Sequence, residues 1–261
     1  GRRRDTMSVV REKMLILINC MFDVRDKTIL IDAEYWNQQP AIDFLTHALM
    51  FRINREGRAI IHGTVQAYLR GSDDRLLRLL KAAEESGVSY VLKLVRGSYM
   101  ETERNRSMKM SVPPPIQFTI EDSHVAYDAC ARHMARRILD LSGRSSRLHP
   151  SLWLATHNKE SISKVLDQLM ETEDRSCIQN KQFTFAQLKG MCDSLSAMVA
   201  DQGLSVSKYV PFGPIDEVAP YLARRIQENS AIGAASAHEV RFIIDELRHR
   251  INGSSKAPPT A

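Results

Sequence analysis

The 261-residue sequence has little cysteine and lacks several patterns that would assign it quickly to a class of protein. No apolar run approaches the roughly 18–20 residues that a membrane-spanning helix needs. The four cysteines (Cys20, Cys130, Cys177 and Cys192) are widely spaced and include no C-x-x-C pair. This spacing indicates neither a zinc ribbon nor a disulfide framework, and it suggests a reducing compartment. The eight histidines show no metal-ligand spacing, so no metal site is predicted.

A concentration of charge of one sign is also absent. The net charge is +5, and the 36 lysines and arginines are interspersed with 31 acidic residues. A nucleic-acid-binding domain usually carries a clustered basic stripe with interleaved aromatic residues, so no nucleic-acid partner is expected. The opening Gly1–Arg4 is basic but lacks the length of a targeting peptide. The hydrophobic content of 43% and the charged content of 26% are ordinary for a globular domain.

What the sequence does contain is an alternation of apolar runs with segments of helical periodicity. The apolar runs are typical of strands buried on both faces. The expected strands are residues 28–32, 58–65, 90–95, 152–156, 182–185 and 206–212. The expected helices are residues 8–22, 40–53, 72–87, 121–142, 158–171, 188–201, a helix from about 216 that carries two arginines, and 237–251. A loop around Pro113–Pro115 is expected before residue 121.

Repeated strand–helix units of this length indicate an α/β protein with a parallel sheet and crossover helices. Six strands suit either an open doubly wound sheet or most of a barrel, and two observations favour the barrel. No G-x-G-x-x-G follows the first strand, so the phosphate turn of a dinucleotide-binding sheet is missing. Polar residues also recur at the C-terminal end of nearly every strand, where a TIM-type barrel has its active-site mouth. These residues are Asp32, Glu34, Gln66, Arg96, Thr156, His157, Gln187 and Tyr209.

The helix near the C-terminus has an unusual polar face. Tyr221, Arg224, Arg225 and Glu228 are spaced i, i+3, i+4 and i+7, which places all four on one side. Two adjacent guanidiniums favour a bidentate anionic guest, such as a small carboxylic acid or a phosphate. A pair of arginines is also common on a solvated charged face, so the spacing alone leaves both interpretations open.

The third expected strand contains a lysine within its apolar run and ends in an Arg-Gly pair. By strand alternation Lys93 points into the barrel, where an ammonium needs an anionic or hydrogen-bonding partner. Arg96 and Gly97 then offer a cation and an unhindered backbone, which suits a phosphate. The alternative is a snorkelling lysine followed by an ordinary turn glycine.

The fourth expected strand ends in Thr156, His157 and Asn158. This order places a hydroxyl and an imidazole at the mouth, with Asn158 as the N-cap of the next helix. A lone histidine at a strand end is more often structural than catalytic, and both roles remain open for His157.

Seven short segments with distinctive sequences follow one another between about residues 28 and 235. They are Ile-Asp-Ala-Glu34, Val-Gln-Ala-Tyr68, Lys-Leu-Val-Arg-Gly-Ser-Tyr99, Ala-Thr-His-Asn158, Phe-Ala-Gln-Leu-Lys-Gly-Met-Cys-Asp193, Lys-Tyr-Val-Pro-Phe-Gly213 and Tyr-Leu-Ala-Arg-Arg-Ile-Gln-Glu-Asn229. In sequence and in order they closely resemble motifs of the proline dehydrogenase family, and in particular those of its eukaryotic, mitochondrial branch.

The resemblance implies a distorted (βα)8 TIM-type barrel over residues 28–251, with the last helix across the barrel mouth. Residues 1–27 are expected to form an N-terminal helix and linker, and residues 252–261 a disordered tail. The implied cofactor is FAD, and the implied reaction is the oxidation of L-proline to Δ1-pyrroline-5-carboxylate, the first step of proline catabolism. The implied partners are a quinone-type electron acceptor and the mitochondrial inner membrane, with the protein attached peripherally on the matrix side.

The resemblance also assigns roles at the substrate end of the site. Arg224 and Arg225 match the arginines that clamp the substrate carboxylate. Tyr209 and Tyr221 match the tyrosines that pack beside the proline ring. A bidentate clamp of this kind would fix the ring carbon against the flavin face.

The catalytic and cofactor residues are assigned in the same way. Asp32 matches the active-site aspartate that holds the polar network together, and Lys93 matches the basic residue beneath the flavin ring. The cofactor contacts implied by the resemblance are Gln66, Lys93, Arg96, Gly97, Tyr99, Thr119, Thr156, His157, Asn158, Gln187, Leu188 and Glu228. Cationic groups in such positions would stabilise negative charge that develops on the flavin.

Two departures from the family pattern matter. The family has an earlier strand that supplies an active-site lysine, and residues 1–27 offer no obvious replacement, so the barrel is expected to be incomplete at its N-terminus. A truncated, non-catalytic paralogue that keeps the fold as a binding module is therefore one alternative. The other is hydroxyproline dehydrogenase, in which the residue matching Tyr209 tends to be serine, so that Tyr209 favours proline.

Overall fold

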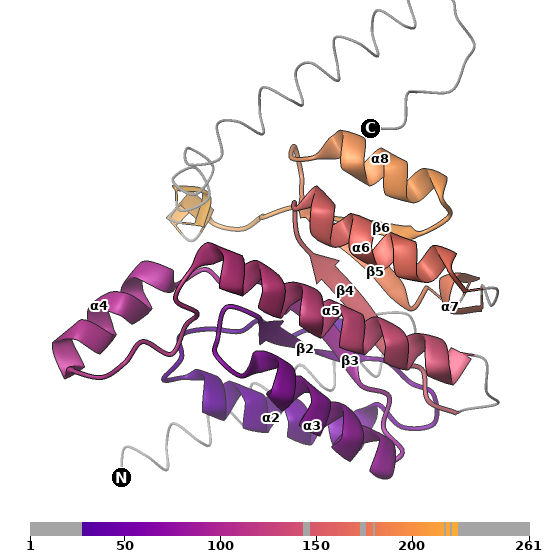
Figure 1. Cartoon of the computed structure of the whole chain (residues 1–261), viewed down its shortest axis with the longest axis horizontal. Coiled ribbons are helices and arrows are strands. Elements are labelled where there is room, and N and C mark those ends of the chain that lie inside the picture. The colour runs from indigo at the N-terminus through magenta and orange to yellow at the C-terminus, as the bar shows by residue number, and fades with distance from the viewer. Residues whose placement is uncertain are drawn as a thin grey trace, which may run out of the picture.

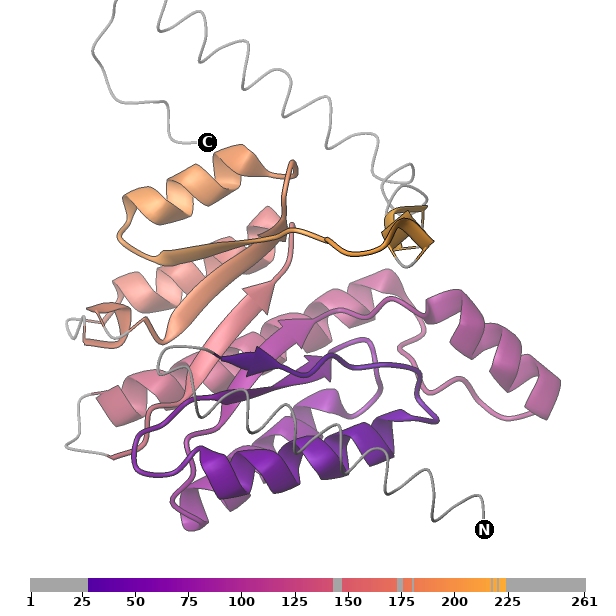
Figure 2. The same cartoon turned by 180° about the vertical axis from the view of Figure 1, so that it is seen from behind.

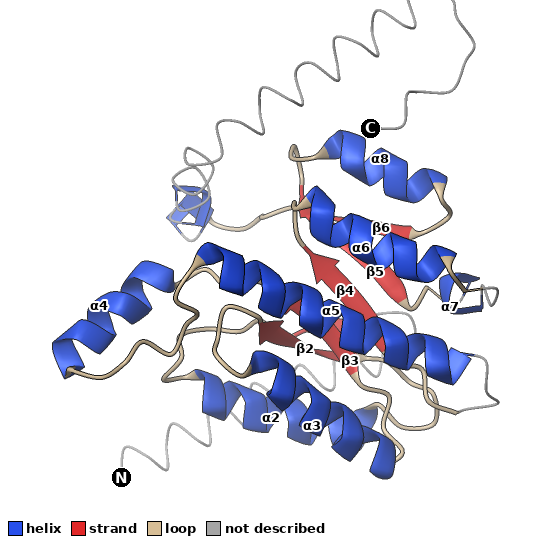
Figure 3. Ribbon diagram, viewed as in Figure 1, coloured by secondary structure: helices blue, strands red, loops and turns tan. Residues whose placement is uncertain are grey.

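The computed structural model describes residues 28–142, 147–172, 176–179, 181–216, 218–219 and 221–223. These residues form one parallel sheet of six strands with helices between successive strands (Figures 1 and 3). The strands lie side by side in chain order: β1 (Ile29–Leu30), β2 (Ile61–Gln66), β3 (Val91–Val95), β4 (Ser151–Ala155), β5 (Phe183–Leu188) and β6 (Ser205–Tyr209). A parallel sheet whose strands follow the order of the chain, each with a crossover helix, is the arrangement of a TIM-type barrel wall.

The helices of the described residues are α2 (Gln39–Ile53), α3 (Ser72–Glu85), α4 (Met100–Met110), α5 (Ile120–Ser142), α6 (Lys159–Met170), α7 (Ser176–Gln179) and α8 (Asp193–Asp201). Figure 1 views the sheet from the side of α3, α5 and α6, and Figure 2 shows its opposite face. The sheet curls about this opposite, concave face. Both views show α4 projecting away from the sheet.

The core lies between the sheet and its helices. Gly63 of β2 leaves room for α2, because a Cβ atom at this position would lie 3.3 Å from Thr46 and 3.5 Å from Met50. Leu92 and Leu94 of β3 and Phe183 and Phe185 of β5 are buried within the same cluster. Alternate residues of each strand therefore pack against helices, and the residues between them face the concave side.

The parallel α/β architecture expected from the sequence is confirmed, and each expected strand overlaps an observed one. The described residues contain six strands in an open, curled sheet with β1 and β6 at its edges. This is a half-barrel, and its closure into eight strands stays a prediction. The helices expected at residues 8–22 and 237–251, and the residues beyond 223, lie outside the described part of the chain.

Several boundaries differ from the expectations. The strand expected at 206–212 ends at Tyr209, and the helix expected at 188–201 begins only at Asp193 because β5 continues to Leu188. Helix α4 lies in a stretch for which the sequence predicts no helix. Its sequence carries no apolar stripe, and only Glu103 and Ser107 of it are buried, so the periodicity that identifies an amphipathic helix is missing. Helix α7 is too short to give such a signal.

A buried asparagine joins the end of α2 to the start of the sheet. Asn54 is fully buried, and its Oδ1 accepts hydrogen bonds from the backbone N–H groups of Ile60 (3.0 Å) and Ile61 (2.9 Å). Its Nδ2 donates to the carbonyls of Ile61 (2.8 Å) and Ser89 (3.2 Å). One side chain thus satisfies buried backbone groups at the starts of β2 and β3.

Replacing Asn54 with Ala should therefore lower the free energy of unfolding by about 3 kcal/mol or more, since several buried backbone groups lose their partner at once. Urea denaturation followed by circular dichroism measures this change. Asn105→Ala on the exposed face of α4 is the matched control and should change the value by less than about 0.5 kcal/mol. Equal stability of the two variants would contradict the role given to Asn54.

Candidate active site

The register of the sheet places one row of side chains across its concave face. Hydrogen-bonded pairing aligns the Cα atoms of five successive strands in this row, from β2 to β6. Its residues are Thr64, Lys93, Trp153, Thr184 and Ser205. Because parallel strands share one direction, the polar residues that follow this row lie together at the C-terminal edge.

Lys93 and Asp32 meet on this face. The Nζ atom of Lys93 forms an ion pair with Oδ1 of Asp32, and the lysine side chain is 20% exposed. Lys93 was expected to need an anionic or hydrogen-bonding partner, and Asp32 is that partner. Asp32 is 65% exposed, so the pair adds little to stability and instead holds the ammonium in place on the concave face.

Glu34 connects the end of β1 to the ends of β2 and β3. Its carboxylate accepts a hydrogen bond from the hydroxyl of Tyr99 (2.6 Å), and its carbonyl accepts one from Nε2 of Gln66 (2.8 Å). The Oε1 atom of Gln66 is buried and has no hydrogen-bond partner among the described residues. Gln66 also lines a cavity of about 240 Å³ at the end of β2. An orphaned buried acceptor beside a cavity fits a ligand with an N–H donor.

The sequence places Glu34 at the end of a strand but indicates no specific role for it. Its contact to Tyr99 spans 65 residues of sequence, so no local spacing could have indicated it.

Arg96 is the most connected side chain at the strand ends. Its Nε donates to Nδ1 of His124 (2.8 Å). Its two terminal nitrogens donate to Oγ1 of Thr156 (2.6 Å) and Oγ of Ser161 (2.8 Å). The guanidinium also lies 4.2 Å from the ring centroid of Tyr127, a distance at which a cation is attracted to the ring. These contacts join β3, β4, α5 and α6, and we call the five residues the Arg96 cluster.

Charge in the Arg96 cluster is incompletely balanced. Burial lowers the pKa of the Arg96 guanidinium, while Tyr127 and Asp128 act in the opposite direction. The carboxylate of Asp128 is engaged by Ser161 (2.5 Å) and by Lys164 (2.8 Å). Among the described residues Arg96 forms no ion pair with a carboxylate. A half-buried cation without a counterion favours an anionic ligand.

The glycine after Arg96 is required by the packing around it. Gly97 has φ +133°, a conformation that side chains rarely adopt, and a Cβ atom there would lie 2.4 Å from the ring of Tyr68. Tyr68 is itself buried, so its ring has little room to move. The Tyr68 ring thus covers the backbone of Gly97 on the side where a Cβ would stand, and this packing accounts for the glycine.

The ends of β4 and β5 are held together by two of the predicted cofactor residues. Nε2 of His157 accepts a hydrogen bond from the backbone N–H of Leu188 (3.0 Å). Gln187 is buried; its Nε2 donates to the carbonyl of Thr156 (3.5 Å) and its Oε1 accepts from Ser196 (2.9 Å). Asn158 caps α6 by accepting from the N–H of Ser161 (2.9 Å), which confirms the expected N-cap. These contacts position the strand ends.

Thr119 lies apart from the concave face. Its hydroxyl accepts from the N–H of Asp122 (3.0 Å), and the carboxylate of Asp122 accepts from the N–H of Thr119 (3.2 Å). This reciprocal arrangement is a capping box at the start of α5. Among the described residues, no hydrogen bond or ion pair joins Thr119 to another predicted cofactor residue.

At the end of β6 the rings of Tyr209 and Tyr221 lie 5.6 Å apart at an angle of 54°. The two tyrosines predicted to pack beside the substrate are therefore neighbours. Arg224, Arg225 and Glu228 lie outside the described residues, so their placement stays a prediction.

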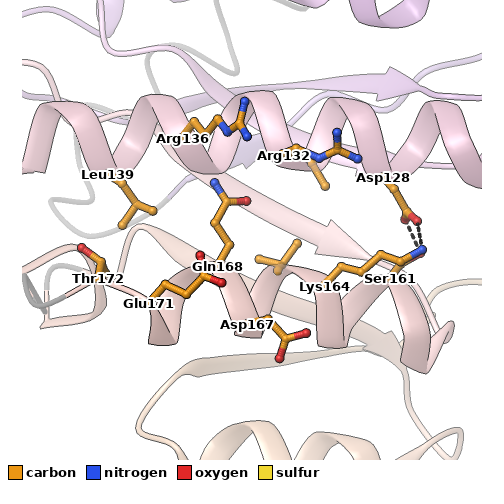
Figure 4. A pocket seen from close by; sticks show the side chains of 12 residues that line it. Asp128, Arg132, Arg136, Leu139, Ser161, Lys164, Asp167, Gln168, Glu171 and Thr172 are labelled. Atoms are coloured by element: carbon orange, nitrogen blue, oxygen red, sulfur yellow. Dashed lines mark hydrogen bonds and ion pairs between the residues drawn. The ribbon is translucent and has the colours of Figure 1, made fainter.

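Another cavity formed by the described residues lies away from the concave face. It has a volume of about 540 Å³ and lies between α5 and α6 (Figure 4). Arg132 and Arg136 of α5 and Asp167 and Glu171 of α6 line this groove from its two sides (Figure 4). Charges of both signs balance along it, and it lies in the helix layer and not on the concave face.

Within the described ranges, no group of three or more His, Cys, Asp and Glu residues is arranged to hold a metal ion. A search of the same part of the chain for helices long and apolar enough to cross a membrane found none.

The Gly97 geometry gives a direct test of the site. Gly97→Ala should destabilise the fold by roughly 2–4 kcal/mol, because the new Cβ meets the buried Tyr68 ring in addition to the backbone cost. Gly71→Ala is the matched control, since Gly71 also has positive φ (+71°) but has no atom within 4 Å of the added Cβ. Gly71→Ala should lower the free energy of unfolding by only about 1 kcal/mol. Thermal unfolding of both variants measures the difference, and equal losses would contradict the packing described.

Comparison with known proteins agrees with this geometry. A family model described as proline dehydrogenase matches residues 14–238. Proline dehydrogenase 1, mitochondrial, of Arabidopsis thaliana is 37% identical over 228 residues, which is 85% of this chain and 43% of that protein. The Caenorhabditis elegans protein of the same name is 36% identical and covers 88% of this chain and 36% of its own length. Hydroxyproline dehydrogenase of Bos taurus is 34% identical, and the match covers 86% of this chain and 48% of that protein.

The fold is similar to that of solved structures of proteins named proline utilization A. A bifunctional proline utilization A protein superposes with a TM-score of 0.65 at 23% identity, covering 82% of this chain and 21% of that protein. Proline utilization A from Bdellovibrio bacteriovorus, inactivated by N-propargylglycine, gives 0.64 at 21% identity, covering 77% and 20%. The chain thus spans less than half the length of the curated relatives it matches. By the extent of the family match and the identity to these relatives, the chain belongs to the proline dehydrogenase family.

Proposed function

We propose that this chain oxidises L-proline to Δ1-pyrroline-5-carboxylate with FAD. The observation that carries the proposal is the gathering of Asp32, Gln66, Lys93 and Arg96 at the C-terminal edge of one parallel sheet, in a chain of this family. Side chains at this edge of a barrel wall are the ones that reach a bound cofactor and substrate.

Two features of the site fit a flavin nucleotide. The buried Oε1 of Gln66 lacks a donor, and the flavin ring carries an N–H group. Arg96 lacks a counterion among the described residues, and the pyrophosphate of FAD is an anion. The residues expected to hold FAD are therefore Gln66, Lys93, Arg96, Gly97, Tyr99, Thr119, Thr156, His157, Asn158, Gln187, Leu188 and Glu228.

The chemistry that FAD supplies when bound is acceptance of a hydride equivalent from the substrate carbon. The ammonium of Lys93, oriented by Asp32, is a fixed positive charge that would stabilise negative charge developing in the site. Arg224 and Arg225 would bind the substrate carboxylate as a bidentate clamp. Tyr209 and Tyr221 would form an aromatic wall beside the ring and limit access of water. The substrate amine must be unprotonated to react, so activity should rise with pH.

The remaining features of the proposal concern the rest of the domain. We expect residues 28–251 to form the barrel domain, with the last helix across the barrel mouth above the strand ends. Residues 1–27 would form a helix and linker, and residues 252–261 a tail. A quinone would accept the electrons, and the protein would act on the matrix side of the mitochondrial inner membrane in peripheral contact with it. The support for this location is the word "mitochondrial" in the names of several relatives.

Hydroxyproline is the second candidate substrate, because relatives named hydroxyproline dehydrogenase are almost as similar to the chain. Tyr209 favours proline, since its ring occupies space that a ring hydroxyl would need. Comparing kcat/KM for proline and hydroxyproline distinguishes the two candidates. A higher value for hydroxyproline would exclude proline as the preferred substrate. A purified chain that cannot be reconstituted with FAD would instead favour a non-catalytic paralogue.

The substrate clamp can be tested directly. Arg224→Met and Arg225→Met should each raise the KM for proline by about ten- to a hundredfold, because a charge-assisted hydrogen bond to the carboxylate is lost. Flavin content should stay the same. Steady-state kinetics with a dye acceptor measures KM, and Arg132→Met in the α5–α6 groove is the matched control. A KM unchanged in both clamp variants would contradict the assignment.

A further inference from the structure

Asp128 of α5 contacts the Arg96 cluster through a serine. The Oγ atom of Ser161, a buried residue in the first turn of α6, donates a hydrogen bond to Oδ1 of Asp128 (2.5 Å). The same Oγ accepts a hydrogen bond from a terminal nitrogen of Arg96 (2.8 Å). The other carboxylate oxygen of Asp128 accepts from Nζ of Lys164 (2.8 Å), and Figure 4 shows the two side chains of α6 meeting this carboxylate. In the described part of the chain, no hydrogen bond or ion pair joins Asp128 to Arg96 directly.

The chemistry of the three groups fixes the direction of both hydrogen bonds at the serine. A hydroxyl has one hydrogen and two lone pairs, a guanidinium can only donate, and an ionised carboxylate can only accept. Ser161 must therefore give its hydrogen to Asp128 and a lone pair to Arg96. Hydrogen bonds in a chain polarise one another, so the carboxylate also makes the serine oxygen a stronger acceptor.

We propose that Asp128 is a positioning residue that, through Ser161, holds the guanidinium of Arg96 in place for the phosphates of the cofactor. A guanidinium has five N–H groups, and the described residues engage three of them, at His124, Thr156 and Ser161. The two that remain are on the terminal nitrogens and point to an anion. Ser161 fixes one of these nitrogens. The inference rests on the proposed use of FAD.

Burial and charge around Asp128 support this role. Its side chain is only 10% exposed, and Ser161 is buried, so water has little access to the link. Lys164 is 50% exposed and is shared with Glu160 (2.8 Å), so its pair with Asp128 contributes little to stability. Because Asp128 reaches Arg96 only through a hydroxyl, the guanidinium is oriented without a carboxylate occupying the N–H groups that the cofactor needs.

Two roles of Asp128 predict changes of opposite sign when its charge is removed. A carboxylate that acted only as a countercharge would offset part of the charge of Arg96, so its loss would tighten the binding of an anionic cofactor. A positioning carboxylate is needed for binding, so its loss would weaken it. In Asp128→Asn the amide oxygen is expected to stay with Lys164, which turns the amide N–H group toward Ser161. A donor there competes with Arg96 for the serine lone pairs and leaves the serine hydrogen without its acceptor.

The measurement is the dissociation constant of FAD for the purified chain, followed by flavin fluorescence at one pH and one ionic strength. Asp128→Asn and Ser161→Ala should each bind FAD about tenfold more weakly, as expected for loss of one hydrogen bond to a charged group. The double variant should bind no more weakly than Ser161→Ala alone, because both changes break the same link. Asp140→Asn is the matched control: it removes a carboxylate from the same helix, 58% exposed and paired with Arg137 (3.8 Å), and should leave FAD binding unchanged.

A second-site change tests the direction of the serine hydrogen bond. Lys164→Met alone keeps the link from Asp128 to Ser161 and should bind FAD like the wild type. Combined with Asp128→Asn, it frees the amide oxygen to turn toward Ser161 and should restore most of the lost affinity. A purely structural role of Asp128 predicts no such recovery.

Three results would overturn the inference: FAD binding by Asp128→Asn as tight as or tighter than in the wild type, additive losses in the double variant with Ser161→Ala, or no recovery with Lys164→Met. Urea unfolding of the FAD-free proteins gives a readout that does not depend on the cofactor. The shifts in the urea midpoint caused by Asp128→Asn and Arg96→Met should be non-additive, and this coupling should shrink when Ser161→Ala is also present.

A coupling of the same size with and without Ser161 would mean that charge acts through space, and it would contradict the role given to the serine. Absence of FAD binding by the wild type would count against the proposed function, while the unfolding data would still decide whether Asp128 acts on Arg96 through Ser161.

Discussion

The structure depends most on the hydrogen-bonded register of its parallel strands. Each strand pairs with the next in sequence, with the same direction and without a shift of face, from β1 to β6. Residues far apart in the chain are thereby brought to one edge: Asp32 and Lys93 are 61 positions apart and form an ion pair. A slip of one residue in any strand would send its polar end residues into the helix layer. The helices secure the register by burying the other face of the four inner strands, β2 to β5.

At the C-terminal edge a second constraint acts on the connection after β3. Arg96 is tied to α5, α6 and the end of β4, while Gly97 fits under the ring of Tyr68. The same short segment also leads to Tyr99, which reaches back to Glu34. Positioning of this kind lets a binding site keep its shape before the ligand arrives. The concave face therefore combines rigid strand ends with polar atoms that are not fully satisfied by the protein.

Much of this arrangement could be predicted from the sequence, for identifiable reasons. Strands buried on both faces give strong apolar runs, and the inward direction and anionic partner of Lys93 follow from alternation and from the cost of an unpaired ammonium. Helix α4 gave no such signal because it buries almost none of its surface. The contact of Glu34 with Tyr99 and that of His124 with Arg96 could not be predicted from the sequence. They join residues 65 and 28 positions apart and depend on the final packing. The arginine pair at 224 and 225 could be recognised by spacing, but its placement is outside the described residues.

We propose that the C-terminal edge of this sheet binds FAD and that the chain oxidises proline there. This proposal is tested most directly by reconstituting the purified chain with FAD and adding L-proline in the absence of oxygen. The account predicts that the absorbance of oxidised flavin is lost in proportion to the proline added, and that Δ1-pyrroline-5-carboxylate forms in equal amount. A chain that binds FAD but keeps its oxidised spectrum in excess proline would contradict the account.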